Sequence, residues 1–319
     1  MNCDFSSTKI LVIGDLMLDH YIIGESNRMS PEANDVPVVL PKEKYSVPGG
    51  AGNVALTLAA MEAKVSCIGI VGNDNWGRKL ISLLDKSINT SNVIISESYT
   101  TTLKQRTYLE GKQILRVDEE EILDFSYDEK ICNYVSEILP KHDIIILSDY
   151  NKGILNQNTI NYILKVANKY KIPTIVDPKK HNFSNYKGAN IVTPNLNELD
   201  KASKIEISND QSIIKSCQQL IKKNQFEYMV VTKGENGMTI IGKDLVKNIK
   251  PYKVENPDVT GAGDTVVSLL ALMYVNTKDI EVSANIANIA AAFAVSKSGT
   301  TCCSISDLER IIKTQEWRI

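Results

Sequence analysis

The chain has 319 residues, with 36 Lys and Arg against 38 Asp and Glu and an isoelectric point near 6.0. This near-neutral balance argues against the strong positive field that is typical of binding to nucleic acid or an acidic membrane, so we expect a small-molecule partner. The length suits one large α/β domain, residues 1–319, because such folds reach this size around a single core.

The cysteines and the termini indicate a cytoplasmic protein. None of the six cysteines forms a CxxC pair or a zinc-like cluster with the three histidines, so we expect reduced thiols. The longest apolar stretch near the C-terminus, residues 266–275, is too short to span a bilayer. The N-terminus lacks a basic stretch followed by an apolar signal core. The sequence therefore predicts a cytoplasmic location with no membrane partner.

Short β-branched runs alternate with segments of helical periodicity along most of the chain. The runs predict buried strands at 9–14, 65–71, 144–147, 174–176, 189–193 and 229–232. The periodic segments predict helices at 50–63, 76–86, 158–170, 212–223, 261–274, 282–296 and 306–313. Such alternation is typical of an α/β fold with a mainly parallel sheet covered by helices on both faces.

Two segments, residues 21–40 and 101–117, break this rhythm. Both alternate polar with apolar residues, as half-exposed strands do, and we interpret them as strands of a small lid beside the main sheet. Either Glu110-Gly111 or Gly111-Lys112 can supply a hairpin turn in the second segment. The last predicted helix is expected to start at a Ser306 cap, with Glu309 at the capping-box position.

Residues 258–264, with the sequence DVTGAGD, precede an apolar helix. The small residues let the N–H groups of Gly261, Ala262 and Gly263 face a ligand at the positively polarised helix N-terminus, which would form an anion hole. Asp264 can accept the proton of an attacking hydroxyl while those N–H groups stabilise charge on a transferred phosphoryl group. A Gly-rich helix start capped by Asp264 explains the same pattern without any chemistry.

A second glycine-rich segment, PGGAGN at residues 48–53, lies at the start of the first predicted helix. Gly49 and Gly50 allow the backbone close to a sugar, and Asn53 can donate and accept hydrogen bonds to hydroxyls. By itself the segment is equally an ordinary strand-to-helix turn. With both signature segments present in this order, the chain resembles the ribokinase-like (PfkB) family of carbohydrate kinases over essentially its whole length.

The resemblance implies a fold, an activity and a set of partners. The fold would be a ribokinase-like three-layer sandwich with a mainly parallel central sheet and a small β lid. The activity would be phosphorylation of a sugar hydroxyl by ATP with Mg²⁺. The resemblance also implies a homodimer through the lid, and strands with exposed edges commonly pair with another copy.

Asp15 and Asp19 follow the first predicted strand, at the carboxyl end where open α/β sheets bind ligands. The family resemblance places an acceptor for sugar hydroxyls at Asp19. Capping of a turn is the alternative for both residues, and it competes more strongly for Asp15.

The segment Asn195-Leu196-Asn197-Glu198 is similar to the NxxE motif of the family. The resemblance implies that Glu198 orders the water shell of Mg²⁺ and that Asn195 lies near the phosphates. Such indirect binding suits Mg²⁺, which keeps several of its waters in protein sites.

Residues 232–237, TKGENG, follow a predicted strand and resemble the nucleotide-binding turn of the family, with Thr232, Gly234 and Gly237 near ATP. Asn288 matches a position that lines the adenine pocket. A buried helical Asn that satisfies the backbone of a neighbouring segment is an equal alternative there.

Within the family, the chain is most similar to kinase domains that phosphorylate the anomeric oxygen of D-glycero-β-D-manno-heptose 7-phosphate, a step toward nucleotide heptose and lipopolysaccharide. The similar segments are residues 14–21, 28–33, 113–118, 148–153 and 177–179. The chain departs from the subgroup at Asn34-Asp35, where Ala-Pro is more typical, which puts the local lid contacts in doubt.

A sugar that already carries a phosphate needs cationic receivers, and arginine suits a bidentate grip on phosphate. The residues assigned to this substrate beside those above are Asp149, Arg106, Arg116, Lys152 and Lys179. We favour the two arginines for the 7-phosphate. For any one of these basic residues taken singly, a solvated lid or loop charge is the favoured interpretation, and it is the cluster of motif matches that favours phosphate binding.

Two rival hypotheses remain open from the sequence. Another member of the family could act on ribose, fructose or a hexose phosphate, because the fold and motifs are shared. A noncatalytic sugar or nucleotide sensor could retain the fold, although the presence of Asp264, Asn195 and Glu198 argues against it. Subgroup kinases are often fused to a nucleotidyltransferase domain, which we expect to be absent from this chain; a stand-alone kinase and a truncated one are both compatible with the sequence.

Overall fold

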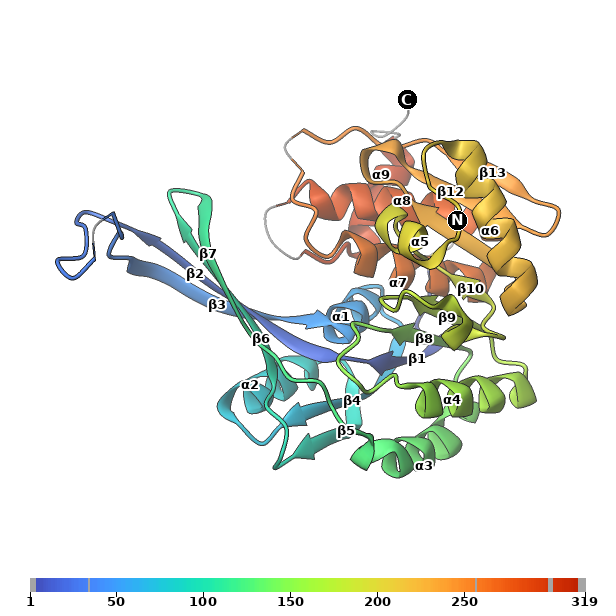
Figure 1. Cartoon of the computed structure of the whole chain (residues 1–319), viewed down its shortest axis with the longest axis horizontal. Helices are drawn as coiled ribbons and strands as arrows, with labels where there is room; N and C mark the ends of the chain where they lie inside the picture. The colour runs from blue at the N-terminus through green and yellow to red at the C-terminus, as the bar shows by residue number, and fades with distance from the viewer. Residues whose placement is uncertain (1–3, 34, 256, 298–300, 315–319) are drawn as a thin grey trace.

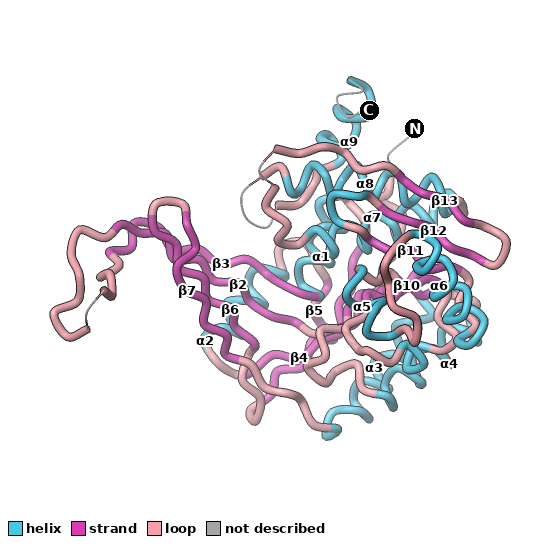
Figure 2. The backbone as a smooth tube through the Cα atoms, turned by 45° about the horizontal axis from the view of Figure 1, so that its top comes forward, coloured by secondary structure: helices cyan, strands magenta, loops and turns pink. Residues whose placement is uncertain are grey.

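A computed structural model describes residues 4–33, 35–255, 257–297 and 301–314. Figures 1 and 2 show an α/β body from which a β arm projects to one side. Within the described residues, nine strands form the sheet of the body, in the order β13-β12-β11-β10-β9-β8-β1-β4-β5. Four further strands form the arm, in the order β3-β2-β6-β7. The expected mainly parallel α/β sandwich with a small second sheet is confirmed.

The body sheet is parallel from β5 to β11, and β12 and β13 extend it in antiparallel fashion. Its strands are β1 (Lys9–Gly14), β4 (Lys64–Gly72), β5 (Asn89–Ser96), β8 (Ile144–Ser148), β9 (Thr174–Asp177), β10 (Ile191–Val192), β11 (Tyr228–Thr232), β12 (Met238–Gly242) and β13 (Val246–Ile249). The central strands are apolar on both faces because helices cover both sides.

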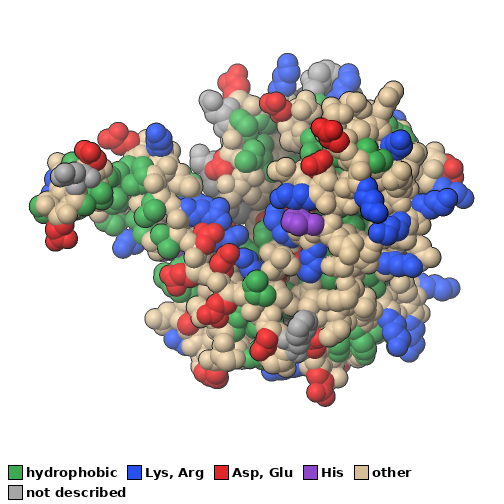
Figure 3. All heavy atoms as spheres, viewed as in Figure 1, with side chains coloured by type: hydrophobic (Ala, Val, Ile, Leu, Met, Phe, Trp, Pro, Cys, Tyr) green, Lys and Arg blue, Asp and Glu red, His purple; other side chains and the backbone are tan. Residues whose placement is uncertain are grey.

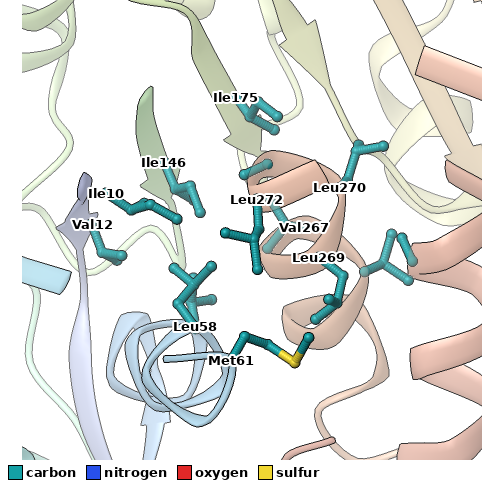
Figure 4. Packing of buried hydrophobic residues seen from close by; sticks show 14 of the residues in the cluster. Ile10, Val12, Leu58, Met61, Ile146, Ile175, Val267, Leu269, Leu270 and Leu272 are labelled. Atoms are coloured by element: carbon teal, nitrogen blue, oxygen red, sulfur yellow. The ribbon is translucent and has the colours of Figure 1, made fainter. Parts of the chain in front are cut away.

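The helices divide into two layers. One layer comprises α1 (Ala51–Ala60), α2 (Asn75–Leu84), α7 (Ala262–Thr277), α8 (Ile280–Val295) and α9 (Ile305–Thr314). The opposite layer comprises α3 (Asp128–Ile138), α4 (Gln157–Tyr170), α5 (Leu196–Ala202) and α6 (Asp210–Asn224). Figure 4 shows the first interface, where Val267 and Leu272 of α7 and Leu58 of α1 pack near Ile10 and Ile146 of the sheet. Among the described residues, none of these helices is long and apolar enough to cross a membrane.

The arm consists of β2 (Leu16–Glu25), β3 (Leu40–Gly50), β6 (Thr102–Leu109) and β7 (Lys112–Glu119). β2 pairs with β6 in parallel, while the β2–β3 and β6–β7 pairs are antiparallel. Glu110 and Gly111 form the hairpin turn with φ of 49° and 79°, which selects the first of the two expected turns. We refer to this four-stranded sheet as the lid.

Three local expectations from the sequence are wrong. The described residues between β2 and β3, 26–33 and 35–39, lie outside both strands, because Pro31 and Pro37 lack the N–H donor that a ladder needs. The run 189–193 yields only the two-residue strand β10. The cap of α9 is Ser304, whose hydroxyl accepts from the Asp307 N–H at 3.1 Å, and not Ser306.

Candidate active site

Asp264 lies in the first turn of α7 with its side chain buried at 5% exposure. Gly261 precedes the helix with φ of 77°, a conformation that glycine adopts without strain. The side-chain amide of Asn53 donates to Oδ2 of Asp264 at 2.6 Å, and the hydroxyl of Tyr150 donates to Oδ1 at 2.8 Å. The two glycine-rich segments, 211 positions apart at Asn53 and Asp264, therefore meet at this carboxylate.

Two opposing effects set the ionisation of Asp264. Burial raises its pKa to about 6, and the nearby Asp19 carboxylate acts in the same direction. The hydrogen bonds from Asn53 and Tyr150, together with the positive charge of Lys104, lower the pKa. The carboxylate is thus more basic than an exposed one and still ionised at neutral pH.

The helix start beside Asp264 exposes backbone donors. The N–H groups in the first turn of an α-helix have no intrahelical acceptor, and those of Ala262 and Gly263 belong to this turn. Of these two, the Ala262 N–H already donates to the Val259 carbonyl, at 3.3 Å. Apart from its chain neighbours and the backbone of the same helix turn, no described atom lies within 4 Å of the position that a Cβ of Gly263 would occupy, so the approach to that turn is open.

Asp19 lies on β2 at the base of the lid and is 7% exposed. Its Oδ1 accepts from the Arg106 guanidinium at 2.5 Å, across the parallel β2–β6 pair. A Cβ at Gly49 would collide with the other carboxylate oxygen, so glycine is required where β3 passes Asp19. Gly50 has φ of 56° and directly precedes α1, whose first turn carries Asn53.

Asp15 lies at the β1–β2 junction and faces a different partner. Its Oδ2 accepts from the backbone N–H groups of Tyr150 at 2.8 Å and Lys152 at 3.1 Å. Burial, followed by repulsion from Asp149, raises the pKa of Asp15 to about 6. The carboxyl holds the loop after β8, which agrees with the turn-capping alternative.

A cleft of about 130 Å³ lies where β8, β9 and β10 end and α5 and α7 begin. Because parallel strands present their carboxyl ends at the same edge of a sheet, residues far apart in the sequence converge here. The lining residues are Asp149, Tyr150, Asp177, Lys179, Thr193, Asn195, Glu198, Thr232, Gly263 and Val266.

The Asn195–Glu198 motif forms a capping box at the start of α5. The Asn195 side chain accepts from the Glu198 N–H at 2.9 Å, and Glu198 Oε2 accepts from the Asn195 N–H at 3.0 Å. The other oxygen of Glu198 pairs with the Lys179 ammonium at 3.1 Å. Leu196 and Asn197 are the first helical residues of α5 and are not among the cleft-lining residues.

The residues expected to bind the nucleotide lie at the end of β11, in the turn after it and on α8. Thr232 ends β11 and lines the cleft, while Gly234 and Gly237 follow in a turn with φ of 57° and 77°. Asn288 is buried on α8, and its amide donates to the Lys250 carbonyl at 2.8 Å. This contact agrees with the alternative in which Asn288 satisfies the backbone of a neighbouring segment.

Of the four basic residues assigned to a sugar phosphate, two lie together in the lid and two lie elsewhere. Arg116 of β7 lies opposite Arg106 in the lid and binds both oxygens of Asp118, at 2.8 and 2.7 Å. Lys152 pairs with Glu120 at 2.6 Å. Lys179 lines the cleft and pairs there with Glu198. The lid arginines are therefore the pair that the structure brings together.

A family model described as pfkB family carbohydrate kinase matches residues 7–307. The chain belongs to the pfkB family of carbohydrate kinases. Family membership makes it a phosphotransferase that acts on a sugar hydroxyl.

Curated relatives of this kinase include the Bifunctional protein HldE of Aliarcobacter butzleri, 39% identical over 304 residues, and that of Helicobacter pylori strain J99, 38% identical over 307 residues. The alignments cover 94% and 95% of this chain but 63% and 66% of the relatives. The kinase thus spans about two thirds of the length of the curated relatives that it matches.

Solved structures support the fold. Phosphofructokinase-2 from Escherichia coli, in complex with substrates and products, superposes with a TM-score of 0.80 at 21% identity and covers 96% of this chain and 99% of its own. Ribokinase of Arabidopsis thaliana, complexed with ribose and ATP, gives 0.75 at 18% identity over 96% and 99% of the two chains.

Four residues of the kinase that carried no assigned role in the sequence lie in the cleft or contact a residue that lines it. Tyr150 and Asp177 line the cleft, while Lys104 and Lys180 contact lining residues. Lys104 of β6 places its ammonium 5.4 Å from the Tyr150 ring centroid. Lys180 pairs with the buried Asp149 at 2.5 Å. Burial, then repulsion from Asp264 and Glu198, raises the pKa of Asp177 well above its usual range. Asp177 directly follows the predicted strand 174–176, and a polar residue at that position is the signal that could have found it.

Proposed function

We propose that this kinase transfers the γ-phosphoryl group of ATP to the anomeric hydroxyl of D-glycero-β-D-manno-heptose 7-phosphate. The product would be the 1,7-bisphosphate, an intermediate toward nucleotide heptose for lipopolysaccharide or another surface glycan. The observation that carries the proposal is the buried carboxylate of Asp264 at the open start of α7, held by Asn53 and Tyr150.

Asp264 acts as the general base in this proposal. Its two donors leave further lone pairs on both carboxylate oxygens, so a sugar hydroxyl can still donate to it. A carboxyl group with a pKa of about 6 is ionised at neutral pH and takes the hydroxyl proton more readily than an exposed carboxylate. The N–H groups of Gly261, Ala262 and Gly263 stabilise charge on the transferred phosphoryl group.

The sugar lies between the base and the lid. Asp19, Gly49, Gly50 and Asn53 surround one approach to Asp264, and Asp19 accepts sugar hydroxyls. Closure of the lid over the sugar excludes water and limits wasteful hydrolysis of ATP.

The phosphate already on the sugar is bound by the lid. Arg106 and Arg116 are each oriented by a carboxylate and retain further N–H donors. Lys104 lies on the same face of β6 as Arg106, and no ion pair to it occurs within the described ranges. We therefore add Lys104 to the two arginines as a phosphate receiver.

ATP occupies the side of the cleft formed by α5, β11 and the turn at Gly234 and Gly237, with its adenine toward Asn288. Asp177 and Glu198 give this wall carboxylate oxygens, the donors that a hydrated Mg²⁺ prefers. No cluster of three ligating side chains occurs in the part of the chain that the structure describes, which fits an ion held through water by Glu198. Mg²⁺, when bound, neutralises charge on the phosphates.

The heptose assignment draws support from where the subgroup-like segments lie. Residues 148–153 and 177–179 supply Asp149, Tyr150, Asp177 and Lys179 of the cleft, and residues 113–118 supply Arg116 of the lid. Lys152 pairs with Glu120 and Lys179 with Glu198, and Lys152 serves the charge of either substrate in this proposal.

We also propose a homodimer through the lid. Every residue of the edge strand β7 is exposed, including Ile114, Leu115 and Val117 at 41%, 53% and 41%. Apolar side chains are visible along the lid in Figure 3. An exposed edge strand with apolar side chains is suited to cover by a second copy.

The substrate is tested by coupled ADP release with D-glycero-β-D-manno-heptose 7-phosphate, its α anomer, fructose 6-phosphate and ribose. We expect the highest kcat/KM with the β-heptose phosphate, because only that substrate presents both the correct anomeric hydroxyl and the distant phosphate. A preference for fructose 6-phosphate would overturn the heptose assignment. Absence of ADP release with every sugar would favour the noncatalytic sensor.

A further inference from the structure

Tyr150 contacts Asp264 from the loop that follows β8. Its hydroxyl donates to Oδ1 of Asp264 at 2.8 Å, while Asn53 donates to Oδ2 at 2.6 Å. One donor on each oxygen fixes the plane of the carboxylate and leaves a lone pair on each oxygen for the acceptor hydroxyl. The phenol of Tyr150 therefore contacts the proposed base and leaves it free to accept from the sugar.

The loop that carries Tyr150 is fastened on both sides. The Tyr150 N–H donates to the buried carboxyl of Asp15 at 2.8 Å. The preceding residue, Asp149, is 2% exposed and accepts from the Lys180 ammonium at 2.5 Å and from the Tyr186 hydroxyl at 2.7 Å. These contacts fix the position of the Tyr150 backbone, so its phenol reaches Asp264 without a large loss of freedom on substrate binding.

We propose that Tyr150 is a positioning residue that orients the carboxylate of Asp264 for the acceptor hydroxyl and favours its ionised form. This inference rests on the proposed role of Asp264 as the base. It also gives Asp15, Asp149 and Lys180 a common task, which is to hold the loop of Tyr150 rather than to contact the sugar.

Several charged or titratable groups face Asp264 from the surrounding elements. They are Asp19 of β2, Lys104 of β6, Tyr150 after β8, Asp177 of β9 and Cys302 after α8. Asp19 raises the pKa of Asp264, whereas Lys104 and the Tyr150 hydroxyl lower it. Loss of the phenol therefore shifts the pKa of the base upward, and the acidic limb of the activity profile should follow.

The test is Tyr150→Phe, assayed for kcat and KM between pH 5 and 9 with one phosphorylated sugar. We expect kcat to fall about tenfold, the KM for ATP to change less than about twofold, and the acidic limb of kcat to move up by about one pH unit. A sugar phosphate also titrates near pH 6, but its contribution is common to both enzymes. Tyr274→Phe removes a phenol that donates to Glu227 at 3.1 Å and should leave the profile unchanged.

An unmoved acidic limb in Tyr150→Phe, with Asp264→Asn inactive, would overturn the positioning role and leave the base intact. Full turnover in Asp264→Asn would instead overturn the proposed function itself. If Tyr150→Phe has too little turnover for a profile, ¹³C NMR titration of the Asp264 carboxyl replaces it. That titration should give a higher pKa in the variant, and equal pKa values in both proteins would contradict the inference.

Discussion

At the scale of single residues, the site depends on how a buried carboxylate is kept ionised. Burial raises the pKa of Asp264, and the hydrogen bonds from Asn53 and Tyr150 lower it. Folding raises the pKa of Asp264 from 3.8 to about 6, so the folded protein binds this proton more tightly than the unfolded chain does. The charged form of Asp264 therefore destabilises the folded state. Its contribution to stability is therefore greatest below pH 3.8 and declines as the pH rises through 6.

Lys104 gives a prediction at this scale. Lys104→Met keeps the bulk of the side chain but removes its charge, so the KM for a phosphorylated sugar should rise about 10- to 100-fold. The KM for ATP should stay within about twofold. The matched control is Lys112→Met, at an exposed lysine beside the turn of the same hairpin. An unchanged KM for the sugar, or a larger rise in the KM for ATP, would contradict the role of Lys104.

At the scale of elements, the sugar side of the site depends on the close passage of β3 over β2. Gly49→Ala would place a Cβ against the Asp19 carboxylate and disturb its pairing with Arg106. We expect kcat/KM for the sugar to fall by about 100-fold, as for other small displacements of a bound substrate. ATP affinity, measured by calorimetry without sugar, should be unchanged, and equal loss for both ligands would contradict the assignment.

The elements that the sequence predicts well are those with a strong apolar pattern. Strands β1, β4, β8 and β11 are buried runs, so their β-branched residues mark them directly. The edge strand β5 is missed because its polar residues alternate irregularly, and α3 because only three of its residues are buried. A strand at the edge of a sheet is partly exposed, so it can fold without the continuous apolar run that predicts a buried strand.

The site is predictable from sequence only where a motif supplies the residue. Asn53 and Asp264 lie in glycine-rich segments whose backbone geometry restricts the residue types. Lys104, Tyr150 and Lys180 lie in no such segment, and their contacts exist only after the strands converge at one edge of the sheet. Asp15 is the opposite case. Its position after the first strand favoured contact with a bound ligand, but its carboxyl instead accepts from backbone N–H groups of the loop after β8.

At the scale of the whole molecule, the lid is the part that the body does not cover (Figures 1 and 2). Leu115→Glu places a charge on the exposed face of β7 and should convert the proposed dimer to a monomer in sedimentation velocity. Val246→Glu on β13, an exposed apolar residue of the body, is the control and should leave the mass unchanged. A wild-type monomer at micromolar concentration would contradict the homodimer.

The central claim is that Asp264 removes the proton of the sugar hydroxyl during phosphoryl transfer. Its most direct test is the single-turnover rate of Asp264→Asn with ATP and the heptose phosphate, alongside calorimetric binding of each substrate. The account predicts binding within about threefold of the wild type and a rate lower by about 10²- to 10⁴-fold. A near-normal rate with intact binding would contradict the role of Asp264 as the base.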